Sequence, residues 1–294
     1  MNQPVIAEML REYACANEQQ AVNAMREIIQ SVALFALSRQ DFFSRAAFYG
    51  GTALRILYGL NRGSEDMDFS LLEPDGAFEL SRYADGIETV FASFGLNVTF
   101  SEKIKVGRSD IRSGFLKSNT RAQLLSIGLD GALARRVHAR SEMKIKIEVD
   151  VQPPPGFGTE IKYLYRPQPF AVRACTLPDL LAGKLHAVLF RSWGSRVKGR
   201  DWYDLAWYAG THPAYNLRHL ENRARQSGDY SDAVPLTDET VHAMLEDRLR
   251  RIDLAAAAED VRPFLRDQND LACWGTAFFL DAFRRLHALE SGRK

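Results

Sequence analysis

The chain has 294 residues, with 38 Lys+Arg against 37 Asp+Glu, so its formal net charge is only +1. This length buries a sizeable core in one large domain or two modest ones. Its apolar runs are all shorter than the roughly 18 residues that span a bilayer, and charged residues near the start argue against a signal peptide. Three widely spaced cysteines argue against a disulfide framework, so we expect a reducing, cytoplasmic location.

Hydrophobic periodicity predicts the elements in chain order. We expect helices over residues 5–46, 52–60, 78–94, 177–192, 200–210, 237–249 and 269–290. We expect strands over residues 46–49, 66–72, 96–100, 124–128, 141–151 and 170–173. Asn17 with Gln20, and Thr176 with Asp179, have the spacing of helix N-terminal caps. The order predicts an α+β fold: N-terminal helices over 1–46, a small mixed-sheet α/β domain over 47–174, and a helical C-terminal domain over 175–294.

The first group of candidate site residues surrounds the strand at 66–72. Gly50 and Gly51 end the preceding short strand, and Ser64 comes two residues before Asp66. Asp66 and Asp68 are two apart, so on a strand they face the same way. Two adjacent carboxylates repel each other unless a cation lies between them, and Mg²⁺ suits such hard oxygen ligands. An acidic surface turn is the alternative interpretation.

A second group lies on the strand at 141–151, where Lys146, Glu148 and Asp150 share one face. A third carboxylate from a neighbouring strand would complete a two-metal site of the kind that activates a hydroxyl and stabilises a leaving pyrophosphate. A half-exposed strand with alternating charges is the alternative. The pattern alone leaves both Glu148 and Asp150 as candidates.

A third group lies in the helical second half. Lys184 stands beside apolar neighbours on a predicted helix, where it either extends its ammonium to solvent or contacts phosphate oxygens. Asp201 and Asp204 are three apart and share a helical face. They either take part in the chemistry or pair with nearby arginines.

The near-zero net charge conceals two blocks of opposite sign. Residues 65–102 contain nine acidic residues and one basic residue, whereas residues 103–146 contain eleven basic and three acidic residues. Such asymmetry carries more information than the total. Two solvated faces that attract each other would explain it, but the basic block also keeps a nucleic-acid partner possible.

Three stretches of sequence, taken together, resemble a known family. They are FYGGTALR over 48–55, RGSEDMDF over 62–69, and Lys184-Leu185 followed by RVKGRDWYDL over 196–205. This pattern is similar to the AbiEii/AbiGii toxins of type IV toxin–antitoxin and abortive-infection systems, which share the DNA polymerase β-like nucleotidyltransferase fold. The resemblance covers roughly residues 48–205, and the remainder of the chain fits only as helical.

The resemblance implies a role for each matching residue. It implies a glycine turn for the triphosphate at Gly50 and Gly51, and a serine before the metal ligands at Ser64. It implies metal binding by Asp66 and Asp68, with Glu148 favoured over Asp150 as the third carboxylate because KIEV resembles the family's short apolar strand. It implies nucleotide contact by Lys184 and by the late basic residues Lys198 and Arg200. It implies a late catalytic aspartate at Asp204, with Asp201 as its rival, because an apparent insertion at 192–195 leaves open which one reaches the site.

The implied activity is Mg²⁺-dependent transfer of a nucleoside monophosphate from an NTP to RNA. Some relatives act on the tRNA 3′ end and so inhibit translation, and a cognate antitoxin is expected. The basic block then becomes a candidate RNA-binding surface. Its candidate residues are Arg108, Arg112, Lys117, Arg121, Arg135, Arg136 and Arg140. Two alternatives are modification of a protein or a small molecule such as an aminoglycoside, and an inactive nucleotide- or RNA-binding module.

Overall fold

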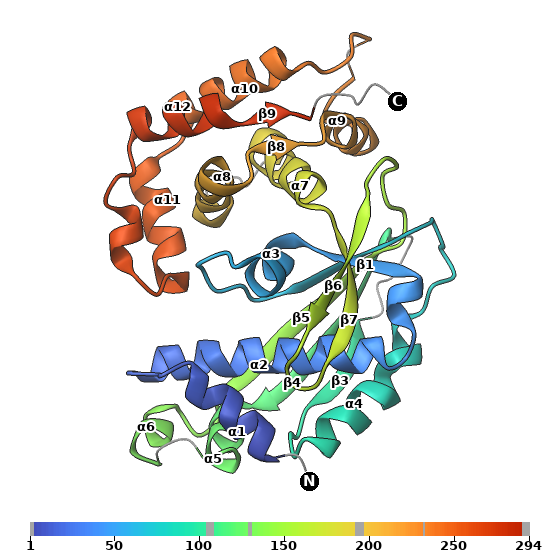
Figure 1. Cartoon of the computed structure of the whole chain (residues 1–294), viewed down its shortest axis with the longest axis vertical. Helices are drawn as coiled ribbons and strands as arrows, with labels where there is room; N and C mark the ends of the chain where they lie inside the picture. Colours follow the sequence, from blue (N-terminus) through green and yellow to red (C-terminus); the bar gives the residue numbers. More distant parts are fainter. Residues whose placement is uncertain (1–2, 104–108, 129–130, 192–196, 232, 290–294) are drawn as a thin grey trace. The chain divides into compact units, whose positions relative to one another are not determined.

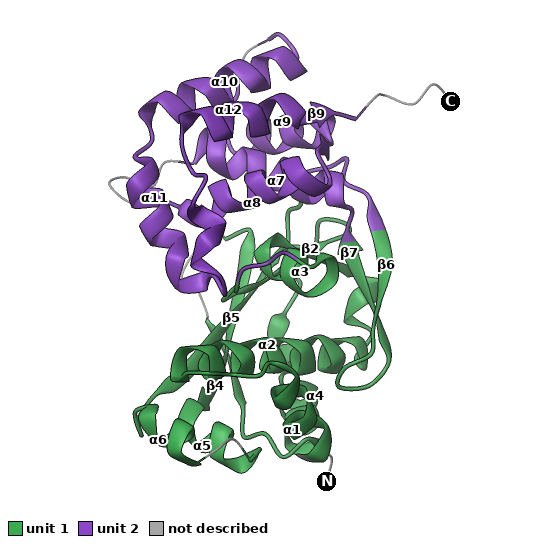
Figure 2. Cartoon of the chain, turned by 60° about the vertical axis from the view of Figure 1, so that its left-hand side comes forward, with its two compact units in different colours: residues 1–59, 63–153, 160–174 green, residues 60–62, 154–159, 175–294 purple. Residues whose placement is uncertain are grey.

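The computed structural model describes residues 3–103, 109–128, 131–191, 197–231 and 233–289. The chain forms two compact units, coloured separately in Figure 2. Unit 1 comprises residues 1–59, 63–153 and 160–174, and unit 2 comprises residues 60–62, 154–159 and 175–294. None of the helices in the described part of the chain has the length and apolarity that a membrane crossing requires.

A seven-stranded mixed sheet forms the centre of unit 1, in the order β3-β4-β5-β2-β1-β7-β6 (Figure 1). β2 runs antiparallel to β1 and parallel to β5, while β4 is antiparallel to both β3 and β5. The strands are β1 (Ala46–Tyr49), β2 (Met67–Leu71), β3 (Thr99–Lys103), β4 (Ile111–Asn119), β5 (Glu142–Asp150), β6 (Thr159–Leu164) and β7 (Phe170–Cys175). The helices are α1 (Gln3–Glu12), α2 (Glu18–Ser38), α3 (Gly50–Tyr58), α4 (Ala84–Ser93), α5 (Thr120–Ser126) and α6 (Gly131–Arg136), with short 3₁₀ turns at Phe42–Ser44 and Leu80–Tyr83.

The core of unit 1 lies where α2 packs on one face of this sheet. Twelve side chains of α2 are buried, and all of them except Gln30 share one hydrophobic cluster with the buried alternate residues of β5, such as Ile145 and Ile147. Asn17 begins α2 as expected, because its side chain accepts a hydrogen bond from the Gln20 backbone N–H at 2.9 Å. The long N-terminal helix is therefore an integral layer of unit 1.

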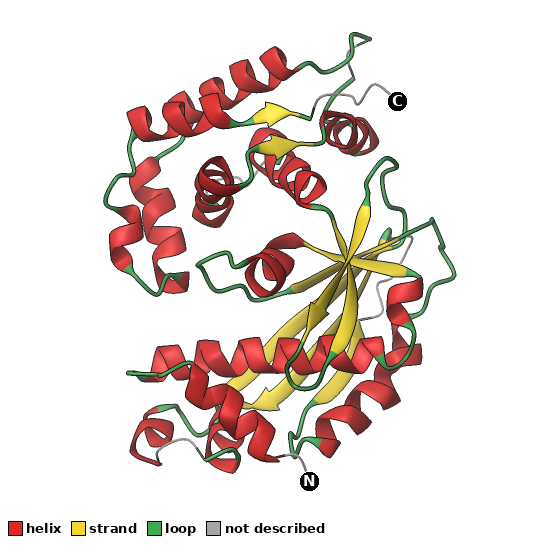
Figure 3. Ribbon diagram, in the orientation of Figure 1, coloured by secondary structure: helices red, strands yellow, loops and turns green. Residues whose placement is uncertain are grey.

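Unit 2 is almost entirely helical (Figure 3). Its helices are α7 (Leu177–Phe190), α8 (Gly199–Thr211), α9 (Leu217–Gln226), α10 (Asp238–Arg251), α11 (Leu254–Val261) and α12 (Thr276–Arg285). A two-stranded pair, β8 (Ala214–Tyr215) with β9 (His287–Ala288), and short 3₁₀ turns at Arg262–Phe264 and Gln268–Leu271 complete it. The mixed sheet followed by helices confirms the α+β class.

Several predicted elements differ from the structure. The strand expected over 124–128 is wrong, because these residues continue and end helix α5, which begins after the Asn119 cap. The apolar run there buries Leu124 and Ile127 three residues apart, which is a helical spacing. β3 begins at Thr99, later than expected, and the helix predicted over 269–290 shortens to α12. Thr176 precedes α7, but its hydroxyl bonds the Asp179 side chain at 2.5 Å rather than capping a backbone N–H.

Candidate functional site

The glycine turn between β1 and α3 lies directly against one predicted metal ligand. Gly50 has a φ of +81°, a conformation that L side chains rarely adopt. A Cβ placed on Gly50 would collide with the carboxylate of Asp68. Only glycine meets both requirements, so this turn allows the backbone to approach the Asp68 side chain closely.

Three of the predicted acidic residues gather on adjacent strands of unit 1. Asp66 is exposed just before β2, and Asp68 is half-buried within it. Asp68 is in register with Glu148 on β5 and with Tyr49 on β1. Registered neighbours point to the same face of a sheet. We call Asp66, Asp68 and Glu148 the carboxylate cluster.

The alternative third carboxylate, Asp150, lies one step further along β5, in register with Ser70. Its Oδ1 accepts a hydrogen bond from the Gln152 backbone N–H at 3.0 Å. Glu148 lies closer to Asp68 along the strand, but its Oε1 is 2.7 Å from Lys146 Nζ. Within the described residues, no group of three or more His, Cys, Asp or Glu side chains converges tightly enough to hold a metal ion. The oxygen donors that Mg²⁺ prefers are present, with Glu148 engaged by a lysine.

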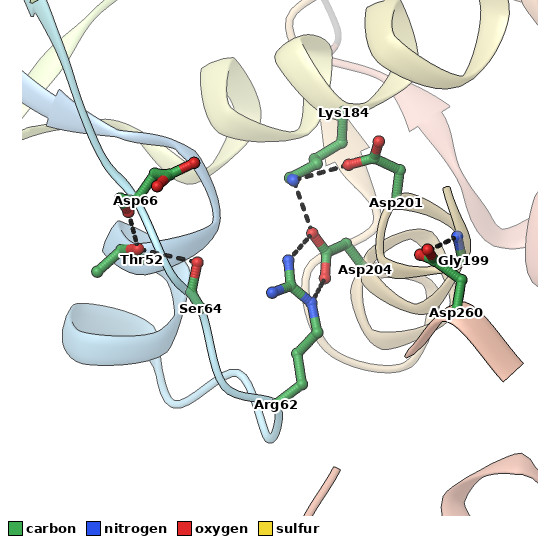
Figure 4. A network of polar contacts seen from close by, with 9 residues as sticks. All are labelled: Thr52, Arg62, Ser64, Asp66, Lys184, Gly199, Asp201, Asp204 and Asp260. Atoms are coloured by element: carbon green, nitrogen blue, oxygen red, sulfur yellow. Dashed lines mark hydrogen bonds and ion pairs between the residues drawn. The ribbon is translucent and has the colours of Figure 1, made fainter. Parts of the chain in front are cut away.

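The loop that leads into β2 is held by hydrogen bonds within unit 1. The Thr52 hydroxyl bonds the backbone carbonyl of Asp66 and lies 2.8 Å from Ser64 Oγ (Figure 4). Gln30 on α2, almost fully buried, donates from Nε2 to the Ser64 and Glu65 carbonyls at 3.1 Å each. Ser64 therefore supports the loop that carries Asp66.

A second group of predicted residues comes together in unit 2, joined by an arginine (Figure 4). Arg62 donates two parallel hydrogen bonds to Asp204, Nε to Oδ1 at 2.7 Å and Nη2 to Oδ2 at 2.6 Å. Lys184 Nζ lies 2.8 Å from Asp204 Oδ2 and 2.9 Å from Asp201 Oδ1. Arg62 and Asp204 are buried, with side chains 2% and 0% exposed. We call Arg62, Lys184, Asp201 and Asp204 the lysine cluster.

In the lysine cluster, the pKa values of Lys184, Arg62 and Asp201 are shifted toward the charged form. Burial would lower the pKa of Lys184, but the carboxylates of Asp201 and Asp204 outweigh it and raise that pKa. Burial likewise opposes the charge on Arg62, yet Asp204 holds the pKa of the guanidinium above its usual value. Burial would raise the pKa of Asp201, and the nearby ammonium of Lys184 lowers it instead. Two cations and two anions thus compensate one another.

The two late basic residues lie at the start of α8. Lys198 is the N-cap residue of this helix, and Arg200 places its guanidinium 4.3 Å from the centre of the Phe264 ring. Between them, the Gly199 N–H donates to Asp260 Oδ2 at 3.0 Å (Figure 4). A Cβ on Gly199 would collide with the backbone carbonyl of Ala257. This end of α8 is therefore fixed against α11, whereas residues 192–195 lie outside the described residues.

The predicted RNA-binding residues do not share one environment. The Arg112 side chain donates to the carbonyls of Gly76 and Phe78, at 2.5 and 3.1 Å, and so connects β4 to a neighbouring loop. Lys117 lies half-buried on β4, and Arg121 half-buried on α5. The remaining three described arginines, on or just after α6, are exposed: Arg135, Arg136 and Arg140. Arg108 lies outside the described residues.

Sequence reasoning gave no role to two residues that organise these clusters. Arg62 pairs with Asp204 within the lysine cluster across 142 positions of sequence, and Thr52 supports the loop before Asp66. Both lie within the stretches FYGGTALR and RGSEDMDF. A buried arginine needs an acidic partner, but nothing local in the sequence indicates which one.

Solved structures of other proteins share this fold. MenT4, a nucleotidyltransferase toxin from Mycobacterium tuberculosis, has a similar structure, with a TM-score of 0.55 and 16% identity over 99% of this chain and 91% of that one. JHP933 from Helicobacter pylori matches with a TM-score of 0.51 and 16% identity, over 90% of this chain and 89% of its own. A search of the curated proteins found no significant match.

These distant structural similarities show the fold but not the family, which a match to a family model identifies. The model for the nucleotidyl transferase AbiEii toxin of type IV toxin–antitoxin systems matches residues 32–286. The match spans most of the chain and includes both clusters. The chain therefore belongs to the AbiEii family of nucleotidyltransferase toxins.

Proposed function

We propose that this toxin transfers a nucleoside monophosphate from an NTP to RNA, at the 3′ end of tRNA, and thereby inhibits translation. The observation that carries the proposal is the Asp66–Asp68 pair at the Gly50 turn, with Glu148 in register beside it. In this reaction a ribose hydroxyl loses its proton to solvent and attacks the α-phosphorus, which forms a P–O ester bond. The bond to the β-phosphate oxygen breaks, and pyrophosphate leaves.

We propose that Asp66 and Asp68 hold Mg²⁺. Glu148 would be the third carboxylate once the ammonium of Lys146 moves away from it. When bound, Mg²⁺ neutralises charge on the phosphates and favours ionisation of the attacking hydroxyl. The absence of a side chain at Gly50 supports this assignment, because it leaves the space that the Asp68 carboxylate occupies. Asp68 and Asp66 would position the reacting groups, which is the main contribution of protein to such transfers.

We assign Lys184 to the triphosphate of the NTP. Its raised pKa keeps it protonated at neutral pH, so it can exchange a carboxylate for a phosphate oxygen. Asp201 is 15% exposed, whereas Asp204 is fully buried and already bonded to Arg62 and Lys184. This supports Asp204 as a positioning residue and Asp201 as the aspartate nearer to substrate. Lys198 and Arg200 remain candidates for further phosphate contacts.

The acceptor assignment depends on the basic block. The exposed Arg135, Arg136 and Arg140 are well suited to contact an RNA backbone. Arg112 is less suited, because its side chain already bonds two carbonyls. Type IV systems pair the toxin with an antitoxin, which is the expected protein partner.

The experiment uses purified full-length protein with each labelled NTP, Mg²⁺ or EDTA, and total tRNA. We expect label at tRNA 3′ ends, no label with EDTA, and at least about a 100-fold lower rate for Asp68→Asn. Glu73→Gln, an exposed acid after β2, is the matched control and should retain the wild-type rate. Label on protein or a small molecule instead would support the other transferase hypotheses. No transfer to any acceptor, with toxicity unchanged in Asp68→Asn, would favour an inactive binding module.

A further inference from the structure

One face of strands β3, β4 and β5 in unit 1 carries a row of lysines around an aromatic ring. Strand alternation separates this face from the core, since Leu116 and Ile145 are buried on the opposite side. On β3 the residues of this face are exposed. We call it the open sheet face; its members are Ser101, Lys103, Phe115, Lys117, Lys144 and Lys146.

Two lysines of this face lie directly opposite each other. Lys117 on β4 pairs in register with Lys144 on β5. Like charges in this position destabilise a sheet. Within the described part of the chain, neither ammonium lies within 4.0 Å of a carboxylate. The pair therefore favours an anionic ligand, which would relieve the repulsion.

The aromatic ring lies among these charges. Lys144 Nζ is 3.9 Å from the centre of the half-buried Phe115 ring, and Phe115 is in register with Lys146. A nucleobase can stack on such a ring, and lysines around it can contact the adjoining phosphates. A base that stacks here would displace the Lys144 ammonium from the ring toward the backbone of the bound strand.

The open sheet face leads directly to the carboxylate cluster. Lys144, Lys146 and Glu148 are alternate residues of β5, so they follow one another on the same face at steps of about 7 Å. Glu148 is in register with Asp68. A strand of RNA bound along β5 would thus reach the carboxylates with its end.

We propose that the open sheet face binds the single-stranded acceptor end of the RNA substrate, with Phe115 stacking on a base and Lys117 and Lys144 contacting phosphates. This inference rests on the proposed function and specifies its acceptor surface. It shifts the main RNA contact from the α6 arginines to the strands beside the carboxylate cluster.

The test measures binding of a 5′-fluorescent, single-stranded RNA 12-mer ending in CCA, and of tRNA, to the full-length protein at several salt concentrations. We expect Phe115→Ala to weaken binding about 5- to 150-fold with an unchanged salt dependence. We expect Lys117→Met with Lys144→Met to weaken it about 10-fold and to reduce the salt slope by about 1.4. Phe115→Tyr should restore most of the affinity.

Lys162→Met is the matched control, because Lys162 also lies over an aromatic ring, that of Tyr58, at the other end of the sheet. It should bind RNA as the wild type does, and all variants should bind a non-hydrolysable NTP equally. Wild-type RNA affinity in both open-face variants, while wild type still labels tRNA, would overturn the inference alone. The same result with weaker binding in Arg135→Glu/Arg136→Glu would assign the acceptor to α6 instead. Absence of labelling by wild type would overturn the proposed function itself.

Discussion

The carboxylate cluster and the lysine cluster place similar acidic residues in opposite environments. In unit 1, Asp66 is exposed and Asp68 half-buried, and a glycine turn leaves room beside them. In unit 2, Asp204 and Arg62 are buried and joined by two hydrogen bonds, and Lys184 completes a balanced network. Acidic side chains thus remain accessible in one region and are enclosed in the other.

Because of this difference, we expect the carboxylate cluster to contribute mainly to activity and the lysine cluster mainly to stability. An exposed carboxylate contributes little to the free energy of unfolding, so its replacement affects mainly what it binds. A buried ion pair behaves differently, because removing one partner leaves the other charged and desolvated. We therefore expect variants of the carboxylate cluster to fold and lose activity, and variants of the lysine cluster to lose stability first.

The largest expected effect follows from Asp204→Ala. It leaves the Arg62 guanidinium buried without its bidentate partner, and we expect a loss of about 3–5 kcal/mol in the free energy of unfolding. All four tryptophans of the chain follow residue 190, so urea denaturation followed by tryptophan fluorescence reports on unit 2 specifically.

Replacing both partners provides the control for that change. Asp204→Leu combined with Arg62→Met removes both charges, and we expect a free energy of unfolding within about 2 kcal/mol of the wild type. If the double variant were as unstable as Asp204→Ala, side-chain packing rather than charge would determine the stability at this site. A stable Asp204→Ala would remove the distinction between the two clusters.

An intermediate effect is expected at the glycine turn. Gly50→Ala combines a positive φ with a collision against the Asp68 carboxylate, so we expect a loss of about 2–3 kcal/mol and weaker activity. Gly59 has a similar φ of +78° but open space around it. Gly59→Ala should therefore cost only about 1 kcal/mol. Far-UV circular dichroism in urea measures both, and equal losses would show that the Asp68 contact contributes nothing.

What the sequence predicts well is local. Alternating residues are sufficient to predict β2 and β5, and two carboxylates at i and i+2 share a face wherever the strand forms. The glycine turn at Gly50 also lies next in sequence to the elements it joins. Most of the carboxylate cluster can therefore be read from short patterns.

The pairing of residues in the lysine cluster could not be predicted from short sequence patterns. Arg62 and Asp204 meet only through tertiary folding, 142 positions apart, and no periodicity relates them. The misassigned strand at 124–128 has a similar cause, because a short apolar run fits either a strand or the last turn of a helix. Packing against α2 decided in favour of the helix, where Leu124 and Ile127 are buried together.

The smallest expected effect on stability completes the comparison. We expect Asp66→Asn with Asp68→Asn to change the free energy of unfolding by less than about 1 kcal/mol, since neither side chain is buried. Transfer to RNA should nevertheless fall at least about 100-fold, because amide oxygens do not replace carboxylate charge around a cation. Denaturation by urea and the transfer assay, run on the same preparation, measure the two effects together. A loss of several kcal/mol would mean that these carboxylates support the fold of unit 1 as Asp204 supports unit 2, and the contrast between the clusters would then be one of position only.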